Sequence, residues 1–291
     1  MRWAFALCAV LVGCDGCREP APISDGSAPT QDASTTTSDA GALSKEAVAK
    51  FLNPGNLPVY DGETAILEGN VFVRGPAAPE LPPPATSTCR NVRDFRLFRE
   101  GAADESGRRP LADAIVGVTG YDVFVPPKGD AVEITVKDCA FDRRTLAMTY
   151  GQHIEVKNAE ALNSGIFYLP KLTKGRAPSD MVVAPGQVVK LYMNELGRAL
   201  LVDGMAHGHL YADVFVARSA LHVVSDRNGH FILAGIPVGT YEVNVLHPAF
   251  DAGKVHAKLT FKPGQTTHHD FELTYLPADG DGGAPSADAG R

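Results

Sequence analysis

Ser225-Asp226-Arg227-Asn228-Gly229-His230-Phe231 is the stretch of sequence that decides how the end of the chain folds. Asp-Arg-Asn-Gly is a tight-turn sequence, because glycine readily takes the positive φ that such turns require. The residues before it, Ala220 to Ser225, and those after it, His230 to Leu233, are rich in apolar side chains. Short apolar runs bounded by turn residues are typical of strands. The stretch therefore predicts two strands joined by a tight turn.

Apolar and polar residues alternate on both sides of this turn. Gly235-Ile236-Pro237-Val238-Gly239 predicts a loop, and Thr240 to His247 predicts a strand. In an earlier strand we expect Ile154 and Val156 to face inward and His153 to face outward. Further strands are predicted at 65–73, 114–118, 121–125, 132–136, 188–193, 200–202, 214–216, 255–261 and 271–275.

A short helix is predicted over Ser44 to Leu52, ended by Asn53-Pro54-Gly55, and no long helix is expected. Short strands with Gly and Pro between them indicate an all-β chain folded as a sandwich or barrel. The net charge of −7 argues against a nucleic-acid partner, which would need a basic surface. We expect Arg108-Arg109 and Arg143-Arg144 to lie on the solvated surface.

The N-terminus has the pattern of an export signal. Arg2 is followed by an apolar run from Trp3 to Val12, too short to span a bilayer, and then by Gly13-Cys14. Leu11-Val12-Gly13-Cys14 resembles the lipobox of bacterial lipoproteins, which implies that residues 1–13 are removed and Cys14 is lipidated. A secretory signal cut elsewhere, or an anchor that is never cut, is the alternative. The resemblance implies a lipid-anchored protein of the bacterial envelope, facing the periplasm or the surface.

Polar, small residues follow, and we expect 14–60 to be a flexible tether and 277–291 a disordered tail. The chain has five cysteines. We expect Cys8 to be removed with the signal, Cys14 to be lipidated and Cys17 to lie in the tether. Cys89 and Cys139 then remain in the folded part. An oxidising compartment favours a disulfide between these two, and two free thiols are the alternative.

Residues 225–231 and 235–241 together are similar to the carboxypeptidase regulatory-like module, with its D-x-x-G-x-F turn and G-x-P-x-G-x-Y strand entry. This resemblance implies a small transthyretin/Ig-like β-sandwich over 218–276. Such modules are non-catalytic appendages in their relatives.

The preceding part is similar to plastocyanin-like (cupredoxin) domains. Lys137-Asp138-Cys139-Ala140-Phe141, Gly151 to Asn158 and Pro185-Gly186-Gln187-Val188 carry this resemblance. It implies a cupredoxin-like sandwich within 61–217.

The copper ligands of that family are mostly replaced in this chain. The first histidine position holds Ser164, the cysteine position holds Gly204 and the methionine position holds Leu210, whereas His207 is kept. A blue-copper centre needs two histidines and a thiolate, so the resemblance implies a degenerate copper site.

His207 and His209 stand two residues apart and would share one side of a strand. We interpret them as exposed loop residues, with a copper or zinc pair completed by Met205 or Asp203 as the alternative. His268-His269 are expected at the surface, and His247 as a structural hydrogen-bonding residue.

We find no nucleophile elbow, no P-loop and no dinucleotide fingerprint. The sequence therefore predicts a non-enzymatic, lipid-anchored envelope protein with no cofactor, which binds a protein or carbohydrate. The alternative function is a periplasmic copper- or zinc-binding or electron-transfer protein that uses His207 and His209.

Overall fold

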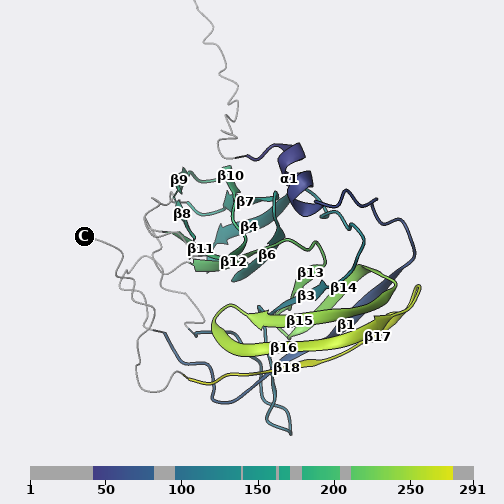
Figure 1. Cartoon of the computed structure of the whole chain (residues 1–291). Helices are drawn as coiled ribbons and strands as arrows, with labels where there is room; N and C mark the ends of the chain where they lie inside the picture. The colour runs from purple at the N-terminus through teal and green to yellow at the C-terminus, as the bar shows by residue number, and fades with distance from the viewer. Residues whose placement is uncertain are drawn as a thin grey trace, which may run out of the picture. The chain divides into compact units, whose positions relative to one another are not determined.

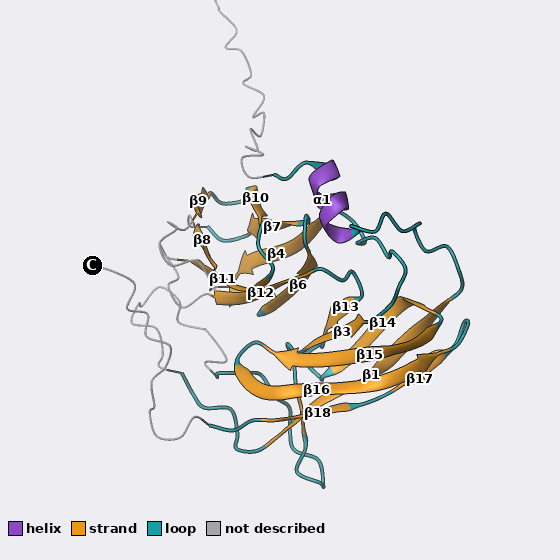
Figure 2. Cartoon of the chain, viewed as in Figure 1, coloured by secondary structure: helices purple, strands orange, loops and turns teal. Residues whose placement is uncertain are grey.

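A computed structural model describes residues 42–81, 96–138, 140–161, 164–170, 179–203 and 211–277. These residues belong to one compact unit, Thr37–Arg291. Apart from the helix α1 (Lys45–Leu52), the regular elements of the described chain are strands (Figure 2). The predicted all-β class is therefore confirmed. No helix in the described ranges has the length and apolar character needed to cross a membrane.

The described strands form four sheets (Figure 1). The first contains β14 (His230–Pro237), β1 (Thr64–Arg74), β17 (Thr266–His268), β18 (Phe271–Thr274) and β2 (Arg109–Pro110). The second contains β13 (His222–Val224), β3 (Ile115–Thr119), β15 (Gly239–His247) and β16 (Phe250–Phe261). The third contains β10 (Val188–Tyr192), β7 (His153–Asn158), β4 (Ala131–Lys137) and β5 (Ala140–Phe141). The fourth contains β6 (Thr145–Thr149), β12 (Tyr211–Ala217), β11 (Gly197–Asp203), β8 (Ser164–Pro170) and β9 (Ser179–Val183).

The first two sheets share one hydrophobic core, and we call this part the outer sandwich (β1–β3 and β13–β18). Leu67 and Phe231 from the first sheet and Val116 and Phe261 from the second are almost fully buried in that core. Two sheets that bury their inner faces against one another form a β-sandwich. The outer sandwich therefore draws on both ends of the folded chain.

The third and fourth sheets share a second core, and we call this part the inserted sandwich (β4–β12). Ile134 and Ile154 come from the third sheet, and Met148 and Leu201 from the fourth. The chain leaves the outer sandwich after β3 and returns at β13, where the Val118 amide donates to the Leu221 carbonyl at 2.9 Å. The inserted sandwich thus begins and ends at adjacent points of its host.

The pairing of β1 differs from the predicted boundary at residue 217. β1 runs antiparallel to β14 and parallel to β17 and β18. β3 lies between β13 and β15. Residues 64–119 therefore complete the C-terminal sandwich, whereas the sequence predicted that they belong to a domain over 61–217. Alternation shows that a segment is a strand but carries no information on its partner.

The predictions that depend only on neighbouring residues, a helix start and a tight turn, are confirmed. α1 begins after Ser44, whose hydroxyl accepts from the Ala47 amide at 3.2 Å, as the sequence predicted. The Asp226–Gly229 turn is confirmed, with Gly229 at φ 76° and its amide donating to the Asp226 carbonyl at 3.0 Å. The strands on either side of it, however, lie in different sheets.

Two predictions about individual strands were wrong. No strand spans 121–125, where Phe124 makes only an isolated bridge with Val59. His153 does not face solvent, since only 8% of it is exposed. It packs against Tyr192, with 5.3 Å between ring centroids, so aromatic packing outweighs the polar character that predicted exposure.

Candidate functional site

Most of the site residues predicted from sequence lie outside the described residues. These are the lipidation site, the predicted disulfide pair and the histidine loop: Cys14, Cys89, Cys139, Gly204, His207, His209 and Leu210. The same holds for the signal 1–13, most of the tether 14–60 and most of the tail 277–291. Ser164 is described as the first residue of β8.

The backbone places Ser164 at the end of the sheet where β11 ends at Asp203 and β12 begins at Tyr211. β11 pairs with β8 so that Asp203 lies opposite Ile166, and it pairs with β12 so that Val202 lies opposite Tyr211. The loop leaves β11 at Asp203, and Ser164 lies two residues beyond the partner of Asp203. Ser164 therefore lies at the end of the fourth sheet where β11 ends and β12 begins.

The donor set at those positions does not fit a blue-copper ion. Gly204 has no side-chain donor, Leu210 is aliphatic and Ser164 offers only a hydroxyl, whereas such a centre requires a thiolate and two imidazoles. Within the described ranges, no three His, Cys, Asp or Glu side chains gather as a metal site requires.

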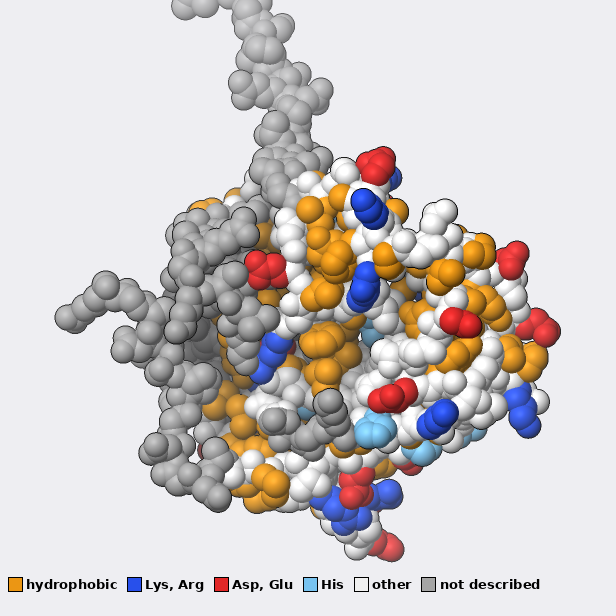
Figure 3. Space-filling model, in the orientation of Figure 1, with side chains coloured by type: hydrophobic (Ala, Val, Ile, Leu, Met, Phe, Trp, Pro, Cys, Tyr) orange, Lys and Arg blue, Asp and Glu red, His pale blue; other side chains and the backbone are white. Residues whose placement is uncertain are grey.

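A cleft of about 650 Å³ lies where the two sandwiches meet. Its walls include Thr145, Ala147 and Thr149 of β6, and His222 and Val224 of β13. On the face that Figure 3 shows, basic and acidic side chains are interspersed among hydrophobic ones. The sequence gives no sign of this cleft, because its walls are distant in the chain and each wall has the pattern of an ordinary strand.

One end of the cleft contains a buried ion pair. The Arg99 guanidinium donates to both oxygens of Asp113, at 2.6 and 2.5 Å, and both side chains are largely shielded from solvent. A bidentate pair of this kind fixes both side chains. Asp113 has φ 69°, a left-handed conformation that aspartate tolerates better than most residues.

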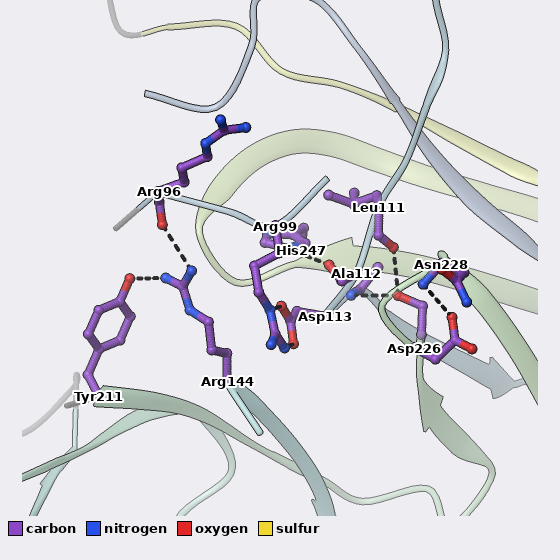
Figure 4. Close-up of polar contacts among 12 residues, drawn as sticks. Arg96, Arg99, Leu111, Ala112, Asp113, Arg144, Tyr211, Asp226, Asn228 and His247 are labelled. Atoms are coloured by element: carbon purple, nitrogen blue, oxygen red, sulfur yellow. Dashed lines mark hydrogen bonds and ion pairs between the residues drawn. The ribbon is translucent and has the colours of Figure 1, made fainter. Parts of the chain in front are cut away.

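His247 lies near this pair (Figure 4) and is a structural residue, as predicted. The Ala249 amide donates to His247 Nδ1 at 3.1 Å, so Nε2 carries the hydrogen and donates to the Ala112 carbonyl at 3.1 Å. Burial lowers the pKa of His247 to about 4. The imidazole is therefore neutral at pH 7.

A polar contact between Thr149 and His222, which both line the cleft, joins the two sandwiches. Thr149 Oγ1 lies 3.2 Å from His222 Nε2, and burial lowers the pKa of His222 to about 4. The side-chain amide of Gln152 donates through Nε2 to the backbone carbonyls of Lys128 and Gly129, at 3.2 and 3.0 Å. The contact between Thr149 and His222 joins one wall to the other.

Arg144 also joins the two sandwiches, contrary to the expectation of a solvated surface. Its guanidinium donates to the Arg96 carbonyl at 2.9 Å and to the Tyr211 hydroxyl, and lies 4.9 Å from the Tyr211 ring centroid (Figure 4). Burial raises the pKa of Tyr211. Arg109 is likewise shielded, in an ion pair with Glu100 at 2.7 Å.

No protein-family model and no curated protein sequence matches the chain. Among solved structures, a mutant amicyanin in its reduced state aligns with 16% identity over 30% of this chain and 82% of its own, with a TM-score of 0.28. A mutant amicyanin with Cu(I) aligns with 15% identity over 35% and 98%, also at 0.28. Amicyanin from Paracoccus versutus aligns with 17% identity over 35% and 97%, at the same TM-score. A TM-score this low does not establish a shared fold, so the architecture rests on the strand pairings.

Proposed function

We propose that this chain is a non-enzymatic, lipid-anchored protein of the bacterial envelope that binds a partner in the cleft between its two sandwiches. In this proposal the inserted sandwich is a cupredoxin-like domain with a degenerate copper site, and the outer sandwich is a carboxypeptidase regulatory-like module. The observation that carries the proposal is the cleft itself, whose two walls belong to different sandwiches. Binding sites occur preferentially at such boundaries.

The side chains of the cleft favour binding over catalysis. Thr149 and His222 resemble a nucleophile and its base, but only 2% of Thr149 is exposed. A hydrolytic set would also need an acid to orient the histidine, and no described carboxylate forms a hydrogen bond with His222. The three carboxylates of the cleft, Asp113, Asp142 and Asp226, all accept hydrogen bonds from the protein.

A copper-binding or electron-transfer role has less support. Of the family's equatorial ligands only His207 is kept, and glycine at position 204 provides no thiolate. A binding role requires none of these donors. We therefore prefer a protein or carbohydrate ligand in the cleft to a metal in the loop 204–210.

The anchor and the cleft are tested separately in living cells. Incorporation of labelled palmitate into the full chain, lost in Cys14→Ser, is the result expected for the anchor. For the cleft, a photo-crosslinking amino acid is placed at position 147 and, as a matched control, at exposed position 262. The proposal predicts a discrete adduct with one envelope component from position 147 alone. Equal adducts from both positions, or none, would contradict it.

A further inference from the structure

The helix α1 is attached to the inserted sandwich by a few contacts near its C-terminal end. The Phe51 ring lies 4.2 Å from the Tyr150 ring, measured between centroids. The Arg218 guanidinium donates to the Phe51 carbonyl at 3.1 and 2.6 Å and lies 4.9 Å from the Phe51 ring centroid. A cation that binds a carbonyl at a helix C-terminus also interacts favourably with the helix dipole. Tyr150 and Arg218 directly follow β6 and β12, so α1 is held where these two strands end.

A glycine allows α1 to approach the sandwich closely. A Cβ at Gly151 would lie 2.3 Å from Val48 Cγ1, and the φ of 92° at this position is one that glycine adopts readily. The Gln152 backbone amide donates to the Thr149 carbonyl at 3.0 Å, and the Gln152 side chain accepts from the Thr149 amide at 2.7 Å. Both Thr149 and Gln152 line the cleft. The helix therefore rests on the turn 149–152, which supplies two residues of the cleft wall.

Beyond α1 the chain runs to the outer sandwich (Figure 1). Asn53 fixes its course, since the Asn53 side chain donates to the Leu57 carbonyl at 2.7 Å and accepts from the Leu57 amide at 2.8 Å. The Tyr60 amide then donates to the Phe124 carbonyl at 2.8 Å, and the Tyr60 hydroxyl accepts from the Val238 amide at 3.4 Å. The two residues that follow Phe124 line the cleft.

Residues 45–63 thus contact both sandwiches next to the cleft, and we call this segment the strap. Its attachment is light. No residue of α1 is buried, and the helix face formed by Val48, Phe51 and Leu52 is only half-buried. A helix of 8 residues is not stable by itself in water, and segments with few buried apolar contacts open at a low cost in free energy. The strap contributes no residue to either buried core, so it can detach while both cores stay folded.

We propose that the strap is releasable and that, while attached, it holds the two walls of the cleft in the arrangement that binds the partner. α1 supports the turn 149–152, and Tyr60 supports the segment 124–126. Release removes both supports and loosens the cleft. The chain before α1 belongs to the predicted lipid-anchored tether, so a pull from the membrane reaches the strap before it reaches either sandwich. The inference rests on the proposed binding function and adds a means of regulating that same cleft.

Hydrogen exchange of the full chain, measured by mass spectrometry, tests the release. In the parent chain we expect the strap to exchange about tenfold faster than β3 and β7. Phe51→Ala should raise exchange in the strap and in the turn 149–152, and should leave β3 and β7 unchanged. Alanine favours helix more than phenylalanine does, so lower helix propensity cannot explain the rise. The matched control is Lys50→Ala, which shortens an exposed side chain of the same helix and should change neither segment.

The consequence for binding is measured with the crosslinking amino acid at position 147. Release lowers the fraction of molecules that can bind, so Phe51→Ala should reduce the yield of the adduct about threefold. Lys50→Ala should leave the yield unchanged.

The effect of a pull is measured with optical tweezers on the full chain, held at position 14 and at the exposed position 157 of the inserted sandwich. We expect one extension step at low force, before either sandwich unfolds. In Phe51→Ala this step should occur at a lower force than in the parent chain, whereas Lys50→Ala should not change it.

A strap that exchanges as slowly as β3 would overturn the inference, because it would then be a permanent part of the fold. So would a Phe51→Ala variant in which the strap is released but exchange in the turn 149–152, or the adduct yield, is unchanged. The lack of a low-force step before unfolding would rule out release by a pull. If the parent chain gives no adduct from position 147, the proposed function is contradicted, and hydrogen exchange still decides whether the strap supports the turn.

Discussion

The two sandwiches differ in how the chain assembles their cores. The outer core is rich in aromatic side chains, with Phe98, Phe231, Phe261, Phe271 and Tyr275 among its buried residues. The inserted core is mostly aliphatic, and Phe141 is the one aromatic residue among its buried members in the described ranges. The inserted core comes from one continuous segment, whereas the outer core needs residues from both sides of that segment. The outer sandwich therefore depends on contacts between distant parts of the sequence.

The largest expected effect follows from the central place of β1. A fragment of residues 218–276, the predicted module, lacks β1 and β3 and should be unfolded, because β14 would lose its neighbour β1 and β15 would keep only β16. A matched chain in which residues 57–127 are joined to 217–277 by a short glycine-serine linker should fold. Dispersed amide signals from the 218–276 fragment alone would refute this organisation.

A single glycine tests the close packing around β1. A Cβ at Gly69 would lie 1.9 Å from the His269 carbonyl oxygen, so Gly69→Ala must displace backbone. We expect a loss of about 3 kcal/mol in the free energy of unfolding, measured by urea denaturation. Gly117→Ala in β3 is the control, since its nearest contact would be an ordinary 3.7 Å and its effect should be small. Equal losses for the two variants would show that β1 is not packed in this way.

The pH dependence of stability should arise in the outer sandwich. His247 has a folded pKa of about 4, below the usual value near 6.5, so the unfolded chain binds the proton first as pH falls. Its contribution is fully present above pH 6.5 and is lost progressively toward pH 4. Between pH 7.5 and 5.5 this amounts to about 1 kcal/mol.

His247→Asn should reduce the slope of that part of the profile without abolishing it, because His222, whose pKa burial also lowers to about 4, titrates in the same window. The substitution also lowers stability at pH 7, because the hydrogen bonds to Ala112 and Ala249 are disturbed. The slope between pH 7.5 and 5.5 is therefore the quantity to compare. An unchanged slope in His247→Asn would be incompatible with a buried neutral imidazole.

The smallest effect is expected at the surface of the outer sandwich. Arg74 and Glu272 are 2.6 Å apart, but their side chains are 42% and 39% exposed. Solvent screening leaves such pairs little net effect, so Glu272→Gln should change the free energy of unfolding by less than about 0.5 kcal/mol. A loss several times larger, in thermal denaturation, would mean that β18 is held to β1 by charge rather than by the buried Phe271 and Leu273.

The sequence predicted local structure better than it predicted which strands pair with one another. The Asp226–Gly229 turn, the helix cap at Ser44 and the strand of Val71 and Val73 depend on neighbouring residues, and these predictions hold. The partners of β1 depend on which distant surface buries Leu67. The alternation of apolar and polar residues along β1 carries no information on that choice. The burial of His153 has a similar origin, since it results from packing against Tyr192.

The candidate site shows the same difference between local features, which the sequence predicts, and contacts between distant segments, which it does not. The cupredoxin resemblance predicted that Ser164 holds a former ligand position, and this stays a prediction; the strand register places Ser164 at one end of β8, near the end of β11. The cleft depends on two edge strands, β6 and β13, being brought together by the insertion. Neither strand carries a motif, so residue types alone gave no signal. Arg143 and Arg144 are adjacent in sequence, yet only the fold shows that Arg144 is engaged and Arg143 is exposed.

The most direct test of this account asks which sandwich contains β1. Leu201→Ala removes a fully buried side chain from the inserted core and should destabilise it by about 3 kcal/mol. Hydrogen exchange measured by mass spectrometry then compares β1, β15 and β7 in the variant and the parent chain. The account predicts that β7 loses protection, while β1 and β15 keep equal, nearly unchanged protection. Loss of protection in β1 together with β7, with β15 unaffected, would contradict the assignment of β1 to the outer sandwich.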